Sequence, residues 1–107
     1  QIIADIKAYI KKYLDSVTRS QIASDFYLSP SYLSKLFRSQ NGISLSEYIQ
    51  RSRMREARRL LLQSTLSISQ IAETVGYPSF AHFSKQFKKM NGMTPNEYRK
   101  NNEGQER

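Results

Sequence analysis

Cysteine is absent from the 107-residue chain, and histidine occurs only once, as His82. Without cysteine there is no disulfide, no zinc site with cysteine ligands and no cysteine nucleophile. One histidine cannot form a metal-binding cluster, and a general base would need a nucleophile or a partner acid beside it, which the sequence does not supply. We therefore expect no enzymatic activity, no metal and no cofactor.

Long apolar runs are also lacking. No stretch approaches the roughly 20 residues that a membrane-spanning helix needs, so we expect no contact with a membrane. The sequence contains no signal peptide and begins with Gln1 rather than methionine. These features favour a piece of a longer cytoplasmic protein.

Acidic residues are missing from two long segments. The chain has 17 Lys and Arg but 9 Asp and Glu, which gives a formal net charge of +8. No acidic residue lies between Asp25 and Glu47, or between Glu73 and Glu97. A surface cleared of carboxylates suits a polyanion such as nucleic acid. Charge by itself leaves a merely soluble basic domain as the alternative.

One sequence pattern occurs twice. Gln21 matches Gln70 at an offset of 49 residues, and Ser34 matches Ser84 at an offset of 50, so one residue, Pro78, is extra in the second copy. Both copies contain a Ser-Gln-Ile-Ala segment, a Ser-Lys pair preceded by an aromatic or aliphatic residue, an Asn-Gly pair and a Glu-Tyr pair. This duplication predicts two similar structural units.

Helix starts and stops are marked strongly. Capping boxes, in which a Ser or Thr is followed three residues later by Glu or Gln, predict four helix starts. The four pairs are Thr18 with Gln21, Ser44 with Glu47, Ser67 with Gln70, and Thr94 with Glu97. Gly42 and Gly92 follow asparagines and predict two helix ends. No strand-like alternation of useful length occurs, so we predict an all-α fold with seven helices, the first over residues 2–14.

Each copy predicts a short helix, a tight turn and a second helix with a small polar and basic outer face, which is the pattern of a helix-turn-helix. The second helices are predicted over residues 30–41 and 80–91. Their inner faces carry Leu33, Leu36 and Phe37 in the first copy, and Phe83, Phe87 and Met90 in the second. We predict a first subdomain at 1–44, a connecting helix at 45–63, a second subdomain at 64–100 and a disordered tail at 101–107.

The connecting helix is the longest helical pattern. Its 19 residues, at a rise of about 1.5 Å each, give a rod of about 28 Å. That length is close to the roughly 34 Å between successive major-groove faces of a duplex. Its arginines are expected to be mainly structural, with Arg53 and Arg58 pairing with Glu56 or Glu47 at helical spacings.

The second copy resembles the signature of the AraC/XylS family of bacterial transcription regulators. The residues that carry the resemblance are Ile71-Ala72, Val75-Gly76-Tyr77, Ser79, Phe83-Ser84-Lys85, Phe87-Lys88, Gly92, Thr94-Pro95 and Tyr98-Arg99. The first copy, with Leu28-Ser29-Pro30-Ser31-Tyr32-Leu33-Ser34 and Phe37, is similar to two-component response regulators that end in this domain. The resemblance implies sequence-specific binding of double-stranded DNA, with two recognition helices in successive major-groove segments. It also implies transcription control, often activation through RNA polymerase contact, and a receiver or sensor domain upstream.

The resemblance also assigns roles to individual residues. Base-facing positions are Ser31, Ser34 and Lys35 in the first recognition helix, and Phe80, Ala81, Ser84 and Lys85 in the second. Phosphate contacts are expected from Arg38, His82, Lys88 and Lys89, although the two lysines at 88 and 89 could instead stabilise a helix C-terminus. Several base-facing side chains are short where family members often carry long ones. Direct readout would then rest on Lys35 and Lys85 at guanine edges and on Ala81 at a thymine methyl.

Two points stay open at this level. Phe80 could touch a thymine methyl or pack against the turn before it. Tyr27 occupies the first turn where the second copy has Gly76, so the two turns could differ in shape. The alternative function is a basic protein-interaction module that contacts an acidic partner. Such a module would not need two equivalent reading helices.

Overall fold

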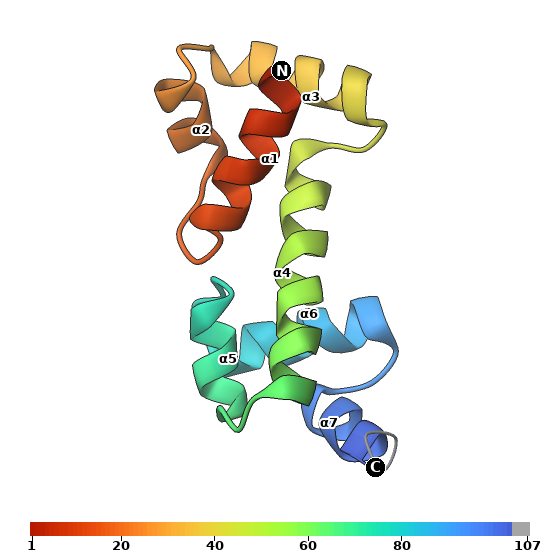
Figure 1. The fold of residues 1–107 in the computed structure, drawn as a ribbon. Coiled ribbons are helices and arrows are strands. Elements are labelled where there is room, and N and C mark those ends of the chain that lie inside the picture. Colours follow the sequence, from red (N-terminus) through yellow and green to blue (C-terminus); the bar gives the residue numbers. More distant parts are fainter. Residues whose placement is uncertain (104–107) are drawn as a thin grey trace. The chain divides into compact units, whose positions relative to one another are not determined.

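A computed structural model describes residues 1–103, and these residues form seven helices (Figure 1). In chain order they are α1 (Ile2–Lys12), α2 (Arg19–Asp25), α3 (Pro30–Asn41), α4 (Leu45–Gln63), α5 (Ile68–Thr74), α6 (Phe80–Asn91) and α7 (Pro95–Glu103). The predicted all-α class and the number of helices are confirmed for this part of the chain. None of these helices combines the length and the apolar character needed to cross a lipid bilayer.

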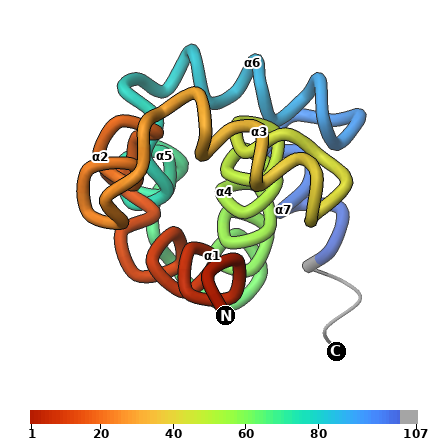
Figure 2. Tube along the Cα trace, turned by 90° about the horizontal axis from the view of Figure 1, so that it is seen from above, coloured from red at the N-terminus to blue at the C-terminus, as the bar shows by residue number. Residues whose placement is uncertain are grey.

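The chain divides into two compact units, Gln1–Ser52 and Arg53–Arg107. The division falls inside α4, so this helix contributes its first part to one unit and its second part to the other. In the first unit α2 packs on α3, and in the second α5 packs on α6. Figures 1 and 2 show that the two helices of each pair run in clearly different directions, as in a helix-turn-helix.

Each unit has its own hydrophobic core. The buried residues of the first unit are Ile3, Ile6, Ile10, Val17, Ile22, Ala23, Leu33, Phe37, Leu45 and Ile49. Those of the second are Met54, Ala57, Leu60, Leu61, Ile68, Ile71, Ala72, Val75, Tyr77, Phe83 and Phe87. The recognition helix of each unit is therefore held by an apolar stripe, and its outer face is left to solvent. Met90, predicted to lie in the core, is 38% exposed because it falls beyond the buried Phe83–Phe87 stripe.

The predicted capping boxes differ in how fully they form. At Ser67 and at Thr94 both reciprocal bonds are present, with Thr94 N donating to Glu97 Oε1 at 2.9 Å and Glu97 N donating to Thr94 Oγ1 at 3.1 Å. Hydrogen bonds from the Thr94 backbone and side chain to the Glu97 carboxylate lower the pKa of Glu97. At Ser44 the cap oxygen accepts from Glu47 N at 3.1 Å, while the Glu47 carboxylate binds Arg51 at 3.0 Å instead. All four boxes nevertheless mark helix starts.

The last helix is longer than predicted. α7 extends to Glu103, whereas the sequence pattern placed a disordered tail from residue 101. Asn102 Nδ2 donates to Tyr98 O at 2.8 Å, which satisfies a carbonyl in the last turn of the helix. The remainder of the predicted tail, residues 104–107, lies outside the described residues. At the other end, α1 stops at Lys12, two residues earlier than predicted.

The two turns adopt the left-handed backbone region with different residues. Tyr27 has φ 58°, and Gly76 at the matching turn has φ 100°. Tyr27 is also 95% exposed, so its ring gains almost nothing from packing. A bulky side chain in the left-handed region costs about 1–2 kcal/mol. The first unit therefore carries backbone strain that the second avoids by using glycine.

We expect Tyr27→Gly to raise the free energy of unfolding by about 0.5–1 kcal/mol, because relief of strain exceeds the added entropy of glycine in the unfolded chain. Gly76→Ala should lower it by about 1–3 kcal/mol, because alanine does not tolerate that φ. Urea denaturation of both variants measures these changes. Tyr27→Ala is the control: it removes the ring and keeps the strain. If Tyr27→Ala stabilises the protein as much as Tyr27→Gly, strain is not the cause.

Candidate nucleic-acid interface

The outer faces of α3 and α6 are built alike. Each helix has 12 residues, a serine N-cap and a left-handed glycine C-cap. Along these 12 positions the order of buried, half-buried and exposed residues is the same in both helices. Ser29 Oγ accepts from Tyr32 N and Ser79 Oγ accepts from His82 N, both at 3.1 Å. The sequence repeat therefore gives α3 and α6 the same length, the same capping residues and the same pattern of exposed positions.

In the first unit, the predicted contact residues lie along one side of α3. Ser31, Lys35 and Arg38 are exposed, and Ser34 is half-buried between them. Their spacing of three and four residues places them on one helical stripe. Both cations on this helix lie on that stripe, and α3 carries no carboxylate. The stripe can thus accept negatively charged groups without local repulsion.

In the second unit, the corresponding stripe on α6 contains Ala81, Ser84, Lys85 and Lys88. Phe80, Ala81, His82, Lys85, Lys88 and Lys89 are all exposed. Phe80 is 46% exposed at the first position of the helix, so part of its ring can reach a ligand. Lys88 and Lys89 lie in the last turn, where the helix dipole also favours them. The predicted contact residues of this unit all lie on α6, and all of them except Ser84 are exposed.

The two matching serines differ in their surroundings. Ser34 Oγ accepts a hydrogen bond from Arg19 Nη1 at 3.2 Å. Ser84 Oγ is buried and has no hydrogen-bond partner. Contact between Ser84 Oγ and a base would require a change of rotamer, whereas Ser34 is already joined to a cation from α2. The role of Arg19 beside the recognition helix was missed from the sequence, because only the fold brings residues 15 positions apart together.

Aromatic contacts hold the start of α6. The Tyr77 ring lies 5.3 Å from the His82 ring and 5.5 Å from the Phe83 ring, measured between centroids. The Arg53 guanidinium lies over the Tyr77 ring, 6.0 Å from its centroid. Burial raises the pKa of the Tyr77 hydroxyl, and the nearby Arg53 charge opposes this rise. His82 is thus oriented by packing on Tyr77, while its side chain stays exposed.

The end of α6 is fixed by a polar contact to α4. Arg58 Nη1 donates to Asn91 Oδ1 at 3.0 Å, and Asn91 Nδ2 donates to Phe87 O at 3.0 Å. The predicted pairing of Arg58 with Glu56 or Glu47 is wrong, because the fold brings the α6 terminus within reach. Arg53 packs on the Tyr77 ring. Glu56 pairs with Arg59 at 2.7 Å, and Glu47 pairs with Arg51 at 3.0 Å.

Arg99 of α7 fixes the other end of α4. Arg99 Nε donates to Leu61 O at 3.0 Å, and Arg99 Nη2 donates to Ser64 O at 3.3 Å. These are carbonyls at the helix C-terminus, which have no partner within the helix. The Arg99 guanidinium therefore caps the C-terminus of α4 and links α7 to it.

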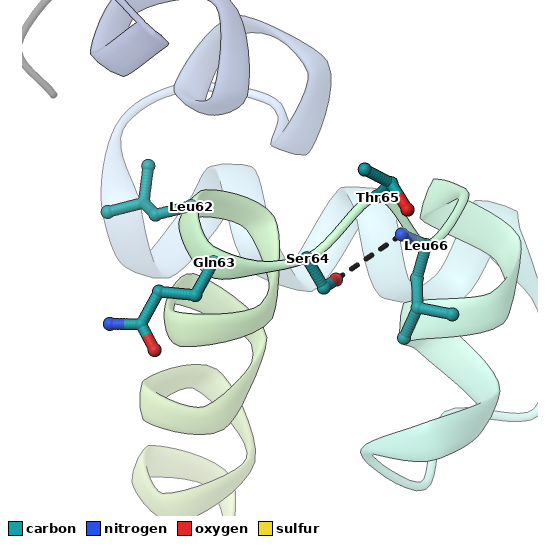
Figure 3. Close-up of a pocket in the computed structure, with 5 residues that line it drawn as sticks. All are labelled: Leu62, Gln63, Ser64, Thr65 and Leu66. Atoms are coloured by element: carbon teal, nitrogen blue, oxygen red, sulfur yellow. Dashed lines mark hydrogen bonds between the residues drawn. The ribbon is translucent and has the colours of Figure 1, made fainter. Parts of the chain in front are cut away.

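A hollow lies outside this interface, in the connection between α4 and α5 (Figure 3). It is lined by Leu62, Gln63, Ser64, Thr65 and Leu66, and Leu66 N donates to Ser64 Oγ at 3.3 Å. The lining comes from one short segment and contains no charged side chain. We assign no ligand to it, and the exposed stripes of α3 and α6 stand as the candidate site.

Comparison with known proteins agrees with this geometry. A family described as a helix-turn-helix domain matches residues 22–101. The regulatory protein PocR of Salmonella typhimurium is 40% identical over 92 residues, which are 85% of this chain and 30% of PocR. The C-terminal domain of AraT, a response regulator from Geobacillus stearothermophilus, superposes with a TM-score of 0.89 at 37% identity, covering 94% of this chain and 84% of that one.

A third comparison concerns the fold alone. The DNA-binding domain of AdpA, solved in complex with a target DNA, has a TM-score of 0.90 at 24% identity and covers 96% of this chain and 94% of its own. The chain spans only 34% and 30% of the length of two curated relatives that it matches, the second of them PocR. The chain belongs to the AraC family of helix-turn-helix domains, the DNA-binding domains of bacterial transcription regulators.

Proposed function

We propose that α3 and α6 each enter a major groove of one DNA duplex, in two successive segments, and that the domain thereby recognises a specific sequence. The observation that carries this proposal is the matching outer face of the two helices, with the same order of exposure and no carboxylate on either. Two equivalent reading helices in one chain suit two turns of one duplex. A module for an acidic protein partner would not need this duplication.

The individual contacts follow from exposure and helical position. Lys35 and Lys85 occupy the same place on the two stripes and can reach guanine edges, and Ala81 can touch a thymine methyl. Ser31, Ser34, Phe80 and Ser84 complete the base-facing set. Arg38, His82, Lys88 and Lys89 contact phosphates, which position the helices without reading sequence. Most of the affinity then comes from phosphate contacts and depends strongly on salt.

The relatives guide the proposal for the whole protein. PocR and the regulator of the msm operon of Streptococcus mutans are named as regulatory proteins, and AraT is named as a response regulator. By analogy, this chain is the reading part of a longer regulator that acts in the cytoplasm. An upstream receiver or sensor domain would control it, and contact with RNA polymerase would activate transcription.

The test is selection of bound duplexes, about two helical turns long, from random sequence, followed by fluorescence anisotropy at several salt concentrations. We expect an enriched motif in two blocks about one turn apart. With about four phosphate contacts, affinity should fall by about 10²-fold between 50 and 200 mM salt. Salt-dependent binding without an enriched motif would reject sequence-specific reading by this chain. Absence of binding at low salt would favour the acidic-protein partner.

A further inference from the structure

The base-facing side chains of α3, the first recognition helix, include two serines that are too short to extend far toward a base edge. Ser31 and Ser34 end at Oγ, one bond beyond Cβ, and both lie on the outward stripe. Lys35 is long, but its ammonium is a flexible point charge that lacks the rigid planar fork by which arginine recognises guanine. The one arginine of α3, Arg38, lies in its last turn and is assigned above to phosphate, so the base-facing side chains of this helix supply no guanidinium.

A guanidinium from a different helix lies on this stripe. Arg19 is the first residue of α2 and is exposed, and its Nη1 donates to Ser34 Oγ at 3.2 Å. Guanidinium has five N–H donors, and this bond uses one of them. No acidic residue lies between Asp25 and Glu47, so α3 offers no carboxylate that could neutralise the cation. The remaining donors are available to a ligand at the stripe.

The second unit lacks this arrangement. There the position after the N-cap of α5 is Ile68, which is buried, in place of Arg19. Correspondingly, Ser84 Oγ has no hydrogen-bond partner. The guanidinium is therefore a property of the first unit and has no counterpart in the second. Two reading helices with matching geometry therefore differ in whether a guanidinium lies beside the matching serine.

We infer that Arg19 is the principal sequence-reading side chain of the first unit, and that Ser34 positions its guanidinium for a bidentate contact with guanine. The inference rests on the proposed function and adds a specificity residue outside the recognition helices. It explains why Ser34 is small: a larger side chain would fill the space that the guanidinium occupies. Guanine offers the matching pair of acceptors, O6 and N7, in the major groove.

The experiment compares motifs selected from random duplexes by the wild type and by Arg19→Ala, Arg19→Lys, Ser34→Ala and Arg51→Ala. We expect Arg19→Ala to lose an about 5- to 100-fold preference for guanine in one block, while the other block is unchanged. Arg19→Lys should keep the charge and lose most of that preference. Ser34→Ala should weaken it less, because the arginine remains but is no longer held.

Arg51→Ala is the matched control. It also removes one exposed arginine from the first unit, in this case one bound to Glu47, and should leave the motif unchanged. Thermal unfolding of each variant confirms that it is folded. An unchanged motif with uniformly weaker binding by Arg19→Ala would assign Arg19 to phosphate and overturn the inference. Unchanged affinity and motif would overturn it as well, leaving only the bond to Ser34. In both cases the wild-type motif in two blocks would still stand, so these failures are distinct from a failure of the proposed function.

Discussion

Phe37→Ala is expected to unfold the first unit while the second unit stays folded. Phe37 is fully buried, and its ring lies 5.3 Å from that of Tyr48, so truncation leaves a large cavity. Such a change costs about 3–5 kcal/mol. A unit of this size, at about 0.1 kcal/mol per residue, has a total stability of about 5 kcal/mol. The expected loss of stability is thus comparable to the total stability of the unit.

The matched variant is Phe87→Ala. Phe87 is also fully buried, and its ring contacts those of Phe83 and Tyr98 at 5.7 and 5.5 Å. Amide hydrogen exchange should show protection lost in α2 and α3 for Phe37→Ala, and in α5 and α6 for Phe87→Ala. Phe37→Leu should be much milder, because most of the core volume is retained. Loss of protection in both units at once in either variant would show that the chain unfolds as one cooperative structure.

Lys85→Ala is expected to weaken binding to the selected duplex by about 5- to 100-fold, and binding to unrelated duplexes by much less. The reason is that Lys85 lies in the middle of the exposed stripe of α6, where a groove-bound helix faces base edges. Fluorescence anisotropy at matched salt measures both affinities. Their ratio is the quantity of interest, since phosphate contacts cancel from it.

Lys89→Ala provides the comparison. Lys89 lies one helical turn beyond Lys85 and is also exposed, but it belongs to the last turn of α6. We expect similar losses with both duplexes and a salt dependence that is shallower by about one unit, as for a phosphate contact. If Lys85→Ala behaves in this way too, Lys85 contacts phosphate rather than a base.

Local sequence signals predicted the helices well. The boundaries of α3 and α6 were predicted to the residue, because a serine N-cap and a following Asn-Gly pair act within a few residues of the helix ends. The helical spacing of the apolar residues indicated the outer stripe of each helix, on the side opposite the core. These features depend on neighbours in the chain, so the sequence contains the information directly.

Contacts between distant segments could not be predicted in this way. Arg58 was expected to pair along its own helix, but it bonds to Asn91, 33 residues away. Arg19 was not singled out, because its contact with Ser34 depends on the packing of α2 against α3. Met90 satisfied the helical spacing of the core and yet lies at its edge. Spacing indicates which residues share a face, whereas packing decides where that face ends.

The division inside α4 has a consequence for taking the protein apart. Because no loop separates the two units, there is no linker at which a protease or a gene fusion could divide them cleanly. A fragment that ends with α4 carries the apolar surface of Met54, Ala57 and Leu61 without its covering helices, and one that begins with α4 carries Leu45 and Ile49 in the same state. Chimaeras that exchange one of the two units between relatives must therefore be joined within α4. The junction must add or remove no residue, so that the buried positions of the helix keep their 3.6-residue periodicity.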